Sequence, residues 1–342
     1  MSLSKASYKV GVVGAGLVGE ELVRVLEQRS FPMAELRVMA RSERSQRIAG
    51  KERQVVVACH EAFEGLDIAL FAGTEGESGA SQIYGWEAVG SGVFVVDNGS
   101  DFRMDERVPL VVPEVNPEAL RRHRGFVSNP NCSTIQMVVA LAPLHRAARI
   151  RRVVVSTYQA VSGTGLPGVR ALAQQRDAAA KGAAPELGPY PHPIYDNVIP
   201  EIGALKDKFP GYYNEEVKMI LETRKILDCP DLAITATCVR VPVAMSHSEA
   251  INVEFERDIS PEEARRILAE APGVTVVDDP KASRYPLAAD AAGEDAVYVG
   301  RIRRDPSRAN ALDLWCVSDN IRKGAALNTV QIAEKAIEMG LL

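Results

Sequence analysis

The segment of this chain with the clearest chemical potential places a cysteine where a helix should begin. Residues 129–134 read Asn-Pro-Asn-Cys-Ser-Thr, and apolar residues that follow at a spacing of about 3.6 predict a buried helix from Ser133. These apolar residues are Ile135, Met137, Val138, Val139, Leu141 and Leu144. The helix dipole would favour the thiolate of Cys132, a nucleophile, and backbone amides could stabilise an oxyanion. The alternative is a buried, inert cysteine.

A glycine-rich turn near the N-terminus indicates a dinucleotide site. Gly14-Ala15-Gly16-Leu17-Val18-Gly19 follows a strand expected over 8–13 and opens a helix expected over 18–28. In this context Gly14 permits a tight turn, Gly16 lets the pyrophosphate approach the backbone, and Gly19 lets the helix pack on the strand. The alternative is a glycine-rich turn that binds no nucleotide.

The segment after the second expected strand bears on the choice of cofactor. It reads Arg41-Ser42-Glu43-Arg44-Ser45 and is expected to be a loop. A carboxylate at this strand end typically accepts the ribose hydroxyls of NAD, whereas arginine suits the 2′-phosphate of NADP. The segment favours NADP, with Glu43 as the contrary feature.

Composition and charge limit the classes of protein to consider. The chain has 342 residues, 46% hydrophobic and 25% charged, with a formal net charge of −5. These values predict two globular domains and argue against nucleic acid as a partner. No window approaches the ~18 apolar residues needed to span a bilayer. The five cysteines are scattered without a C-x-x-C and the five histidines do not cluster, so we expect no disulfides, no metal site and a cytoplasmic location.

The expected secondary structure changes character near residue 131. Before it, strands alternate with helices, which predicts an α/β fold with a Rossmann-type, doubly wound parallel sheet. From residue 150 on, longer strands and intervening helices predict an α+β domain with one mixed sheet, and residues 179–193 are expected to form a loop. The expected strands cover 8–13, 36–40, 54–58, 68–71, 93–97, 152–158, 233–243, 249–255, 297–303 and 312–317. The expected helices cover 18–28, 78–89, 168–180, 214–227, 261–270 and 325–339.

Several segments in one order resemble aspartate-semialdehyde dehydrogenase of the bacterial type. They are DNGSDFR (97–103), VPLVVPEVN (108–116), NPNCST (129–134), STYQAVSG (156–163), NEEVKM (214–219), ETRKI (222–226), VRVPV (239–243) with His247, and KGAALNTVQ (323–331). The resemblance implies NADPH-dependent reduction of L-aspartyl 4-phosphate to L-aspartate 4-semialdehyde with release of phosphate. That reaction lies on the route to diaminopimelate, lysine, threonine, methionine and isoleucine.

The resemblance assigns catalytic roles to three residues. Cys132 would be the nucleophile and form a thioester that hydride then reduces. His247 would be the general acid and base, since its reference pKa lies close to neutrality. Gln159 would orient the thiol and the substrate. Taken alone, His247 would be interpreted as a structural histidine at a strand end.

Five further residues would hold the substrate if the resemblance is followed. Arg240 would bind the α-carboxylate with its planar guanidinium, and Glu215 would bind the α-amino group. Arg103, Lys218 and Asn131 would form the phosphate site. Without the resemblance, Glu215 and Lys218 would be interpreted as a solvated i,i+3 salt bridge on an expected helix.

The resemblance also implies a cofactor site, a domain division and an oligomer. An NADP-binding domain would comprise residues 1–131 and 324–342, and a catalytic and dimerisation domain residues 132–323. A homodimer is expected, and pairing of dimers into a tetramer is left open. The expected cofactor residues are Gly14, Gly16, Leu17, Val18, Gly19, Arg41, Ser42, Arg44, Ser45, Gly73, Ser162, Gly163 and Asn320.

Some residues depart from the family pattern near the expected pockets. The glycine loop is one residue shorter than the family's Gly-Ala-Thr-Gly-Ala-Val-Gly, and Thr74 and Glu75 stand in an expected Ser-Ala-Gly-Gly stretch. Gly99 and Asp101 replace the usual Ser and Ala, and Ser246 replaces a Gly. Asp101 could pair with the neighbouring arginine and weaken anion binding, or point into solvent.

Two other functions remain open from the sequence. Another acyl-phosphate reductase, such as N-acetyl-γ-glutamyl-phosphate reductase, would need a pocket for an acetylated amine, against which the carboxylate of Glu215 argues. A paralogue without turnover would act as a binding or assembly protein, against which the retained Cys132, Gln159, Arg240 and His247 argue.

Overall fold

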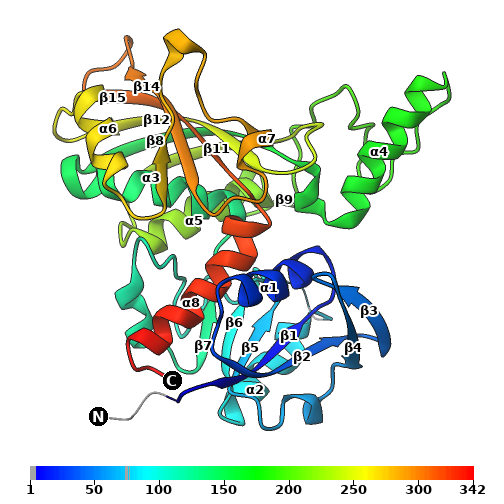
Figure 1. Cartoon of the computed structure of the whole chain (residues 1–342). Helices are drawn as coiled ribbons and strands as arrows, with labels where there is room; N and C mark the ends of the chain where they lie inside the picture. Colours follow the sequence, from blue (N-terminus) through cyan, green and yellow to red (C-terminus); the bar gives the residue numbers. More distant parts are fainter. Residues whose placement is uncertain (1–4, 74–75, 77) are drawn as a thin grey trace. The chain divides into compact units, whose positions relative to one another are not determined.

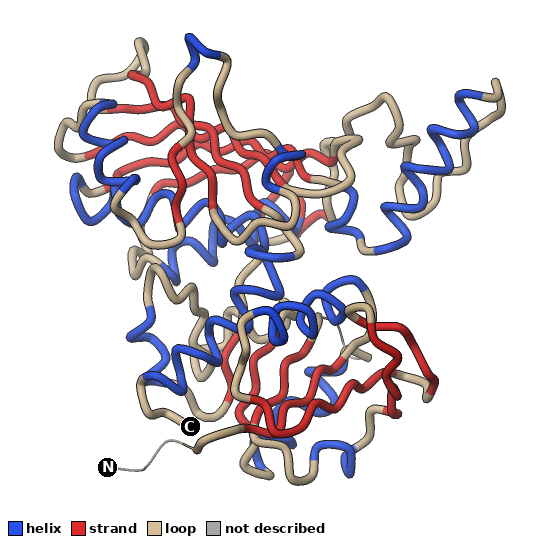
Figure 2. Tube along the Cα trace, in the orientation of Figure 1, coloured by secondary structure: helices blue, strands red, loops and turns tan. Residues whose placement is uncertain are grey.

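The computed structural model describes residues 5–73, 76 and 78–342, and the chain folds as two compact units. The first unit comprises residues 1–131 and 325–342, and the second comprises residues 132–324. Each unit is built around one large sheet, as Figure 2 shows. No helix in the described part of the chain is long and apolar enough to cross a membrane.

The first unit contains a seven-stranded sheet in the order β3-β4-β2-β1-β5-β6-β7. Neighbouring strands are parallel except for β3 and β4, which form an antiparallel edge. The strands are β1 (Tyr8–Val13), β2 (Met33–Ala40), β3 (Arg44–Ile48), β4 (Lys51–Val57), β5 (Ile68–Phe71), β6 (Phe94–Asp97) and β7 (Phe126–Ser128). The Rossmann-type sheet expected from the sequence is confirmed, with an antiparallel edge that the sequence did not reveal.

Apolar layers cover both faces of this sheet. One layer includes Leu22 and Val330 from the contacting helices α1 and α8. The layer on the other face includes Phe71 and Phe126. A core on each face is the doubly wound arrangement. The helices and helical turns are α1 (Leu17–Gln28), η1 (His60–Phe63), η2 (Ser81–Gly85), α2 (Trp86–Gly90), η3 (Pro117–Arg122) and α8 (Leu327–Glu338).

The second unit contains a six-stranded mixed sheet in the order β11-β8-β12-β15-β14-β13. The β11–β8 and β13–β14 pairs are parallel, and the other neighbouring strands are antiparallel. The strands are β8 (Ile150–Gln159), β11 (Ala233–Arg240), β12 (His247–Phe255), β13 (Val274–Val276), β14 (Val297–Arg304) and β15 (Ala311–Ser318). The expected mixed sheet is therefore confirmed.

Helices α3, α5 and α6 pack beside one another against the strands of this sheet (Figure 1). Helix α4 and the segment after it enclose a small separate apolar cluster that includes Val161, Tyr190 and Ile194. The helices are α3 (Cys132–Ala148), α4 (Leu166–Ala180), α5 (Asn214–Ile226), α6 (Pro261–Ala269) and α7 (Ala288–Ala291). Shorter elements are η4 (Val161–Thr164), β9 (Leu205–Lys206), β10 (Phe209–Tyr213), η5 (Pro280–Ala282) and η6 (Arg322–Ala326).

Several boundaries differ from the sequence expectation. Helix α3 includes Cys132 itself rather than beginning at Ser133. Arg44 and Ser45 belong to β3, so only residues 41–43 form the expected loop there. The helix expected over 78–89 is a π-helical turn (η2) followed by the short α2. The strand expected over 233–243 ends at Arg240.

Candidate active site

One edge of the mixed sheet collects polar residues from three strands. Gln159 ends β8 and Arg240 ends β11, and the two are paired in the parallel ladder. His247 begins β12, which runs antiparallel to β8 and therefore starts at the edge where β8 ends. On the other side of β12, His247 pairs with Ser318, the last residue of β15. Residues far apart in the sequence thus meet at one edge.

Helix α3 brings Cys132 to the same edge. Ser318 Oγ donates a hydrogen bond of 2.8 Å to Oε1 of Gln136, one turn after Cys132. Cys132 is the first residue of this helix and is partly buried. The positive end of the helix dipole therefore lies at the thiol, where it stabilises negative charge.

His247 is completely buried and is held as a neutral imidazole. The backbone N–H of Ala160 donates a hydrogen bond of 3.0 Å to Nδ1, so the proton of the neutral ring resides on Nε2. Burial, aided by the nearby Arg240 charge and opposed by Glu215, lowers the pKa of His247 to about 3. No atom of the described structure bonds to Nε2, which leaves an N–H donor for a ligand.

The missing side chain of Gly163 leaves space beside this imidazole. A Cβ atom added there would lie 2.8 Å from Nη1 of Arg240 and 3.3 Å from Nε2 of His247. Arg240 is itself buried, and its Nη1 donates a 2.7 Å hydrogen bond to the carbonyl oxygen of Ala160. A cation and a neutral N–H donor therefore border one small space.

A buried chain of polar side chains supports Gln159. Its Nε2 donates a 3.0 Å hydrogen bond to Oε1 of Glu215, and its Oε1 accepts one of 2.9 Å from Thr157. Lys218 Nζ lies 3.9 Å from Oε2 of Glu215. Because the side chains of Glu215 and Lys218 are only 9% and 16% exposed, the interpretation of this pair as a solvated salt bridge is wrong.

Asn320, in the turn after β15, joins two segments that flank the imidazole. Its Oδ1 accepts hydrogen bonds of 3.0 Å from Ser162 Oγ and from the backbone N–H of Ser246. Its Nδ2 is buried and has no partner among the described residues. Asn320, Ser162 and Gly163 therefore cluster at the edge that carries His247.

Sequence reasoning assigned no role to two further residues of the second unit, one on β12 and one beside Cys132. Glu249, two residues after His247 on β12, is completely buried, and burial raises its pKa well above the ordinary value. The alternation along a strand, which places residues 247 and 249 on one face, could have indicated it. Gly324 packs against Cys132. It belongs to the quoted KGAALNTVQ segment, but no sequence signal distinguishes it there.

The glycine loop of the first unit has the geometry of a dinucleotide fingerprint. Gly14 has φ +114°, and a Cβ atom on Gly19 would lie 1.8 Å from the carbonyl oxygen of Gly14. Gly16 caps α1 and has no atom within 4 Å of an added Cβ. Leu17 and Val18 form the first turn of α1. The open backbone at the start of α1 suits a pyrophosphate.

The end of β2 presents arginine and serine beside this loop, since β1 and β2 are adjacent and parallel. Arg44 Nη1 donates hydrogen bonds of 3.0 and 3.1 Å to the carbonyl oxygen and Oγ of Ser42. Glu43 Oε1 instead accepts from Gln54 Nε2 at 3.1 Å. Arg41 is exposed, and Ser45 Oγ donates to a glutamate of β4.

A second polar group of the first unit follows β6. Arg103 is buried and donates a 2.7 Å hydrogen bond to the carbonyl oxygen of Asn98. Burial raises the pKa of Asp97 to about 6, against the effects of the Gly99 N–H, Ser81 and Arg103. Asn131 is also buried in this unit. Lys218 belongs to the second unit, so the joint phosphate site of Arg103, Asn131 and Lys218 stays a prediction.

Asp101 follows neither of the two expectations for it. Its carboxylate accepts hydrogen bonds of 3.2 and 3.0 Å from the backbone N–H of Gly76. Residues 101–104 form turns. The carboxylate therefore ties down the segment after β5, where Gly73 has φ +86°. Thr74 and Glu75 lie outside the described residues.

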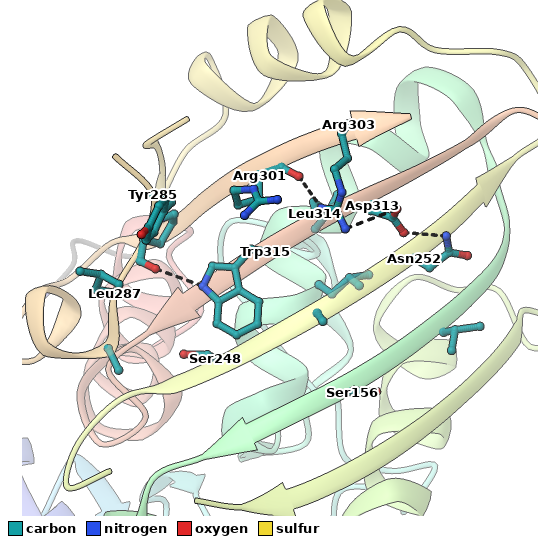
Figure 3. Close-up of a pocket in the computed structure, with 15 residues that line it drawn as sticks. Ser156, Ser248, Asn252, Tyr285, Leu287, Arg301, Arg303, Asp313, Leu314 and Trp315 are labelled. Carbon is teal, nitrogen blue, oxygen red and sulfur yellow. Dashed lines mark hydrogen bonds and ion pairs between the residues drawn. The ribbon is translucent and has the colours of Figure 1, made fainter. Parts of the chain in front are cut away.

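The opposite face of the mixed sheet carries a wide pocket away from this site (Figure 3). Ser248, Ala250 and Asn252 line it from β12, and alternation along the strand turns these residues away from the His247 face. Trp315 is fixed in it by a 3.1 Å hydrogen bond from Nε1 to the carbonyl oxygen of Pro286. No group of three or more His, Cys, Asp or Glu residues placed to hold a metal ion occurs in the described ranges.

Comparisons with known proteins match both units. A family model described as semialdehyde dehydrogenase, NAD binding domain, matches residues 9–123, and one described as semialdehyde dehydrogenase, dimerisation domain, matches residues 141–323. The first unit therefore carries a domain of the type that binds a nicotinamide cofactor. Aspartate-semialdehyde dehydrogenases of Aquifex aeolicus and Bacillus subtilis are 48% and 47% identical, covering 98% and 97% of this chain and 99% and 98% of the relatives. The crystal structure of aspartate semialdehyde dehydrogenase II from Vibrio cholerae complexed with ASA has a TM-score of 0.91 and 41% identity, covering 98% of this chain and 99% of that one.

Proposed function

The chain belongs to the aspartate-semialdehyde dehydrogenase family, as the resemblance in its sequence implied, and we propose that it catalyses the NADPH-dependent conversion of L-aspartyl 4-phosphate to L-aspartate 4-semialdehyde and phosphate. The observation that carries the proposal is the placement of Cys132 at the start of α3, at the sheet edge that holds Gln159, Arg240 and His247. A nucleophile, a proton donor and a buried cation at one edge are what acyl transfer from an acyl phosphate requires.

Substrate recognition would use the buried charges around Gly163. Arg240 has further N–H groups beyond the one bonded to Ala160, and a guanidinium fits a carboxylate with two parallel hydrogen bonds. Glu215, fixed by Gln159, would accept the α-ammonium group. An N-acetylated substrate would offer Glu215 a neutral amide in place of the ammonium group that its carboxylate would bind. The arrangement therefore favours aspartyl phosphate over N-acetyl-γ-glutamyl phosphate.

The covalent step would place charge where the site can stabilise it. The Cys132 sulfur attacks the acyl carbon, the bond to phosphate breaks, and a thioester remains. The Nε2–H of His247 donates to the oxygen on which negative charge develops. The same N–H would stabilise the alkoxide that remains after reduction, until this thiohemiacetal collapses to the aldehyde and the Cys132 thiolate. Gln159 would hold the substrate in line with the thiol.

The cofactor fits the glycine loop, whose open backbone at Gly16 leaves room for a pyrophosphate. Bound nicotinamide supplies the hydride that reduces the thioester. Arg41, Ser42, Arg44 and Ser45 would surround the 2′-phosphate, which favours NADP, because Glu43 is engaged with Gln54. Gly163, Ser162 and Asn320 of the second unit stay predicted cofactor residues; Ser162 orients Asn320, whose Nδ2 has no partner among the described residues.

The pocket face of the mixed sheet would form a homodimer in the cytoplasm. The matched domain is described as a dimerisation domain. Tyr158 is 41% exposed and packs on Trp315 with ring centroids 5.4 Å apart, an aromatic pair well suited to burial by a second copy. Tyr158→Glu should convert the dimer to monomers in light scattering, and an unchanged mass would argue against this face.

Replacement of the nucleophile tests the proposed reaction. Purified protein incubated with aspartate semialdehyde, phosphate and NADP should form reduced cofactor, measured by absorbance. Cys132→Ala should lose at least ~1,000-fold in kcat, because no thioester can form, while its NADP dissociation constant stays within twofold. Cys229→Ala is the matched control, since Cys229 is also partly buried in the second unit, and it should retain full activity. Wild-type turnover by Cys132→Ala would rule out the thioester mechanism.

A further inference from the structure

Gly324 lies directly against the proposed nucleophile. A Cβ atom added to Gly324 would lie 2.7 Å from Cβ and 3.2 Å from Cα of Cys132. Carbon atoms normally approach no closer than about 3.5 Å, so only a hydrogen atom fits between them. Cys132 and Gly324 are also the first and last residues of the second unit.

The backbone at Gly324 does not itself require glycine. Its φ is not positive, and it lies within the helical turn η6. In a helix, alanine is more favourable than glycine by about 1 kcal/mol. The close approach to Cys132 is therefore the physical reason for glycine at this position.

The turn that carries Gly324 is rigidly anchored. The N–H of Gly324 donates a 3.0 Å hydrogen bond to the carbonyl oxygen of Asp319. The Asp319 carboxylate accepts three backbone hydrogen bonds of 2.7–2.9 Å, from Gly293, Ile321 and Arg322. A buried carboxylate with three N–H donors fixes the path of the turn.

The same turn also holds the segment that carries the imidazole. Asn320 accepts the backbone N–H of Ser246, the residue before His247. The turn begins after Ser318, which pairs with His247 in the sheet. One rigid turn, residues 319–324, thus contacts Cys132 at its end and the His247 segment at its start.

We propose that Gly324 is a positioning residue that fixes where Cys132 lies relative to His247. It can do so because the 319–324 turn contacts both Cys132 and the segment that carries His247. The inference rests on the proposed function, in which Cys132 attacks and His247 donates a hydrogen bond to the substrate oxygen. A methyl group at position 324 would displace Cys132 by roughly 1 Å, and a misplacement of that size can reduce a rate about 100-fold. Binding of the cofactor to the glycine loop of the other unit should not change.

Gly324→Ala tests this inference, with Gly90→Ala as the matched control. Gly90 is also helical without a positive φ, and an added Cβ there meets no atom within 4 Å. We expect Gly324→Ala to lower kcat 30- to 100-fold, to change the rate of Cys132 alkylation by iodoacetamide at least threefold, and to leave the NADP dissociation constant within twofold. Alkylation is followed at the Cys132 peptide by mass spectrometry. Gly90→Ala should change none of these quantities.

A second variant keeps the inference testable if Gly324→Ala does not fold. Asp319→Asn weakens the anchor of the turn without adding volume, and it should lower kcat at least fivefold with NADP affinity unchanged. Wild-type kcat and alkylation in both variants would overturn the inference, as would a loss of NADP affinity equal to the loss of kcat. Failure of the proposed function is a separate result: the wild-type protein would then show no turnover, while the alkylation rates would still report the Gly324 contact.

Discussion

Glycine should make the folded protein more stable than serine does at position 246. Its φ is +72°, in the left-handed region, and its side chain is buried with no hydrogen-bond partner for Oγ among the described residues. Left-handed backbone costs a non-glycine residue about 1–2 kcal/mol, and an unsatisfied buried hydroxyl costs about 1–3 kcal/mol. Glycine adds about 0.5–1 kcal/mol of chain entropy to the unfolded state.

The balance predicts that Ser246→Gly stabilises the second unit by about 1–4 kcal/mol, which raises the unfolding midpoint by roughly 2–16 °C in a domain of this size. Thermal unfolding followed by circular dichroism measures this shift. The kcat should stay within threefold, because the backbone N–H that donates to Asn320 remains.

Two control variants separate the contributions. Ser246→Ala removes the hydroxyl and keeps the backbone strain, so it should recover only part of the gain. Ser283→Gly relieves an exposed residue with φ +55°, so it should give at most about 1 kcal/mol, from strain alone. An unchanged or lower midpoint in Ser246→Gly would refute the assignment of strain to this residue.

Three other substitutions test the pockets and the imidazole. Removing Arg41 and Arg44 together should raise the Michaelis constant for NADP at least tenfold more than that for NAD, and equal changes would show that neither binds the 2′-phosphate. Asp101→Ala should release the backbone of Gly76 and raise the Michaelis constant for NADP, with that for phosphate unchanged; a lower phosphate constant would instead restore the idea that the carboxylate repels the anion. The His247 pKa of about 3 lies below its unfolded value of about 6.5, so folded stability is lost as pH falls through this window, by about 2 kcal/mol between pH 6.5 and 5. In urea titrations at several pH values, the free energy of unfolding of His247→Asn should therefore fall less between pH 6.5 and 5 than that of the wild type. The same pH dependence in both proteins would contradict a neutral buried imidazole.

Patterns within short segments of the sequence predicted the glycine loop and the two large sheets. The tight turn at Gly14 and the close helix contact at Gly19 were predicted correctly, because each excludes a side chain. The approach of a pyrophosphate to Gly16 stays a prediction. The parallel and mixed sheets followed from runs of apolar residues. The antiparallel edge was missed because β3, with Arg44, Ser45 and Gln46, is mostly polar and exposed, and such a strand forms through its partner β4.

The features that the sequence did not reveal depend on contacts between distant segments and on backbone angles of the folded chain. Asp101 departs visibly from the family pattern, but its partner is a backbone N–H in a different loop, which no spacing reveals. Gly324 looks like any helical glycine until the helix that begins at Cys132 packs against it. Ser246 was recognised as a departure, whereas its cost depends on a backbone angle that only the folded chain defines.

The tautomer of His247 bears on which group stabilises the sulfur and which donates to the substrate oxygen. Because the Ala160 N–H occupies Nδ1 and burial disfavours the charged ring, the resting imidazole cannot serve as a cationic partner for the sulfur. In the proposed mechanism, the start of α3 would stabilise negative charge on Cys132. The imidazole instead retains one proton, on Nε2, for the substrate oxygen. In the proposed mechanism the helix would therefore serve the sulfur and the histidine would serve the substrate oxygen. Both functions would then depend on the relative position of two backbone segments, which we propose the turn at Gly324 sets.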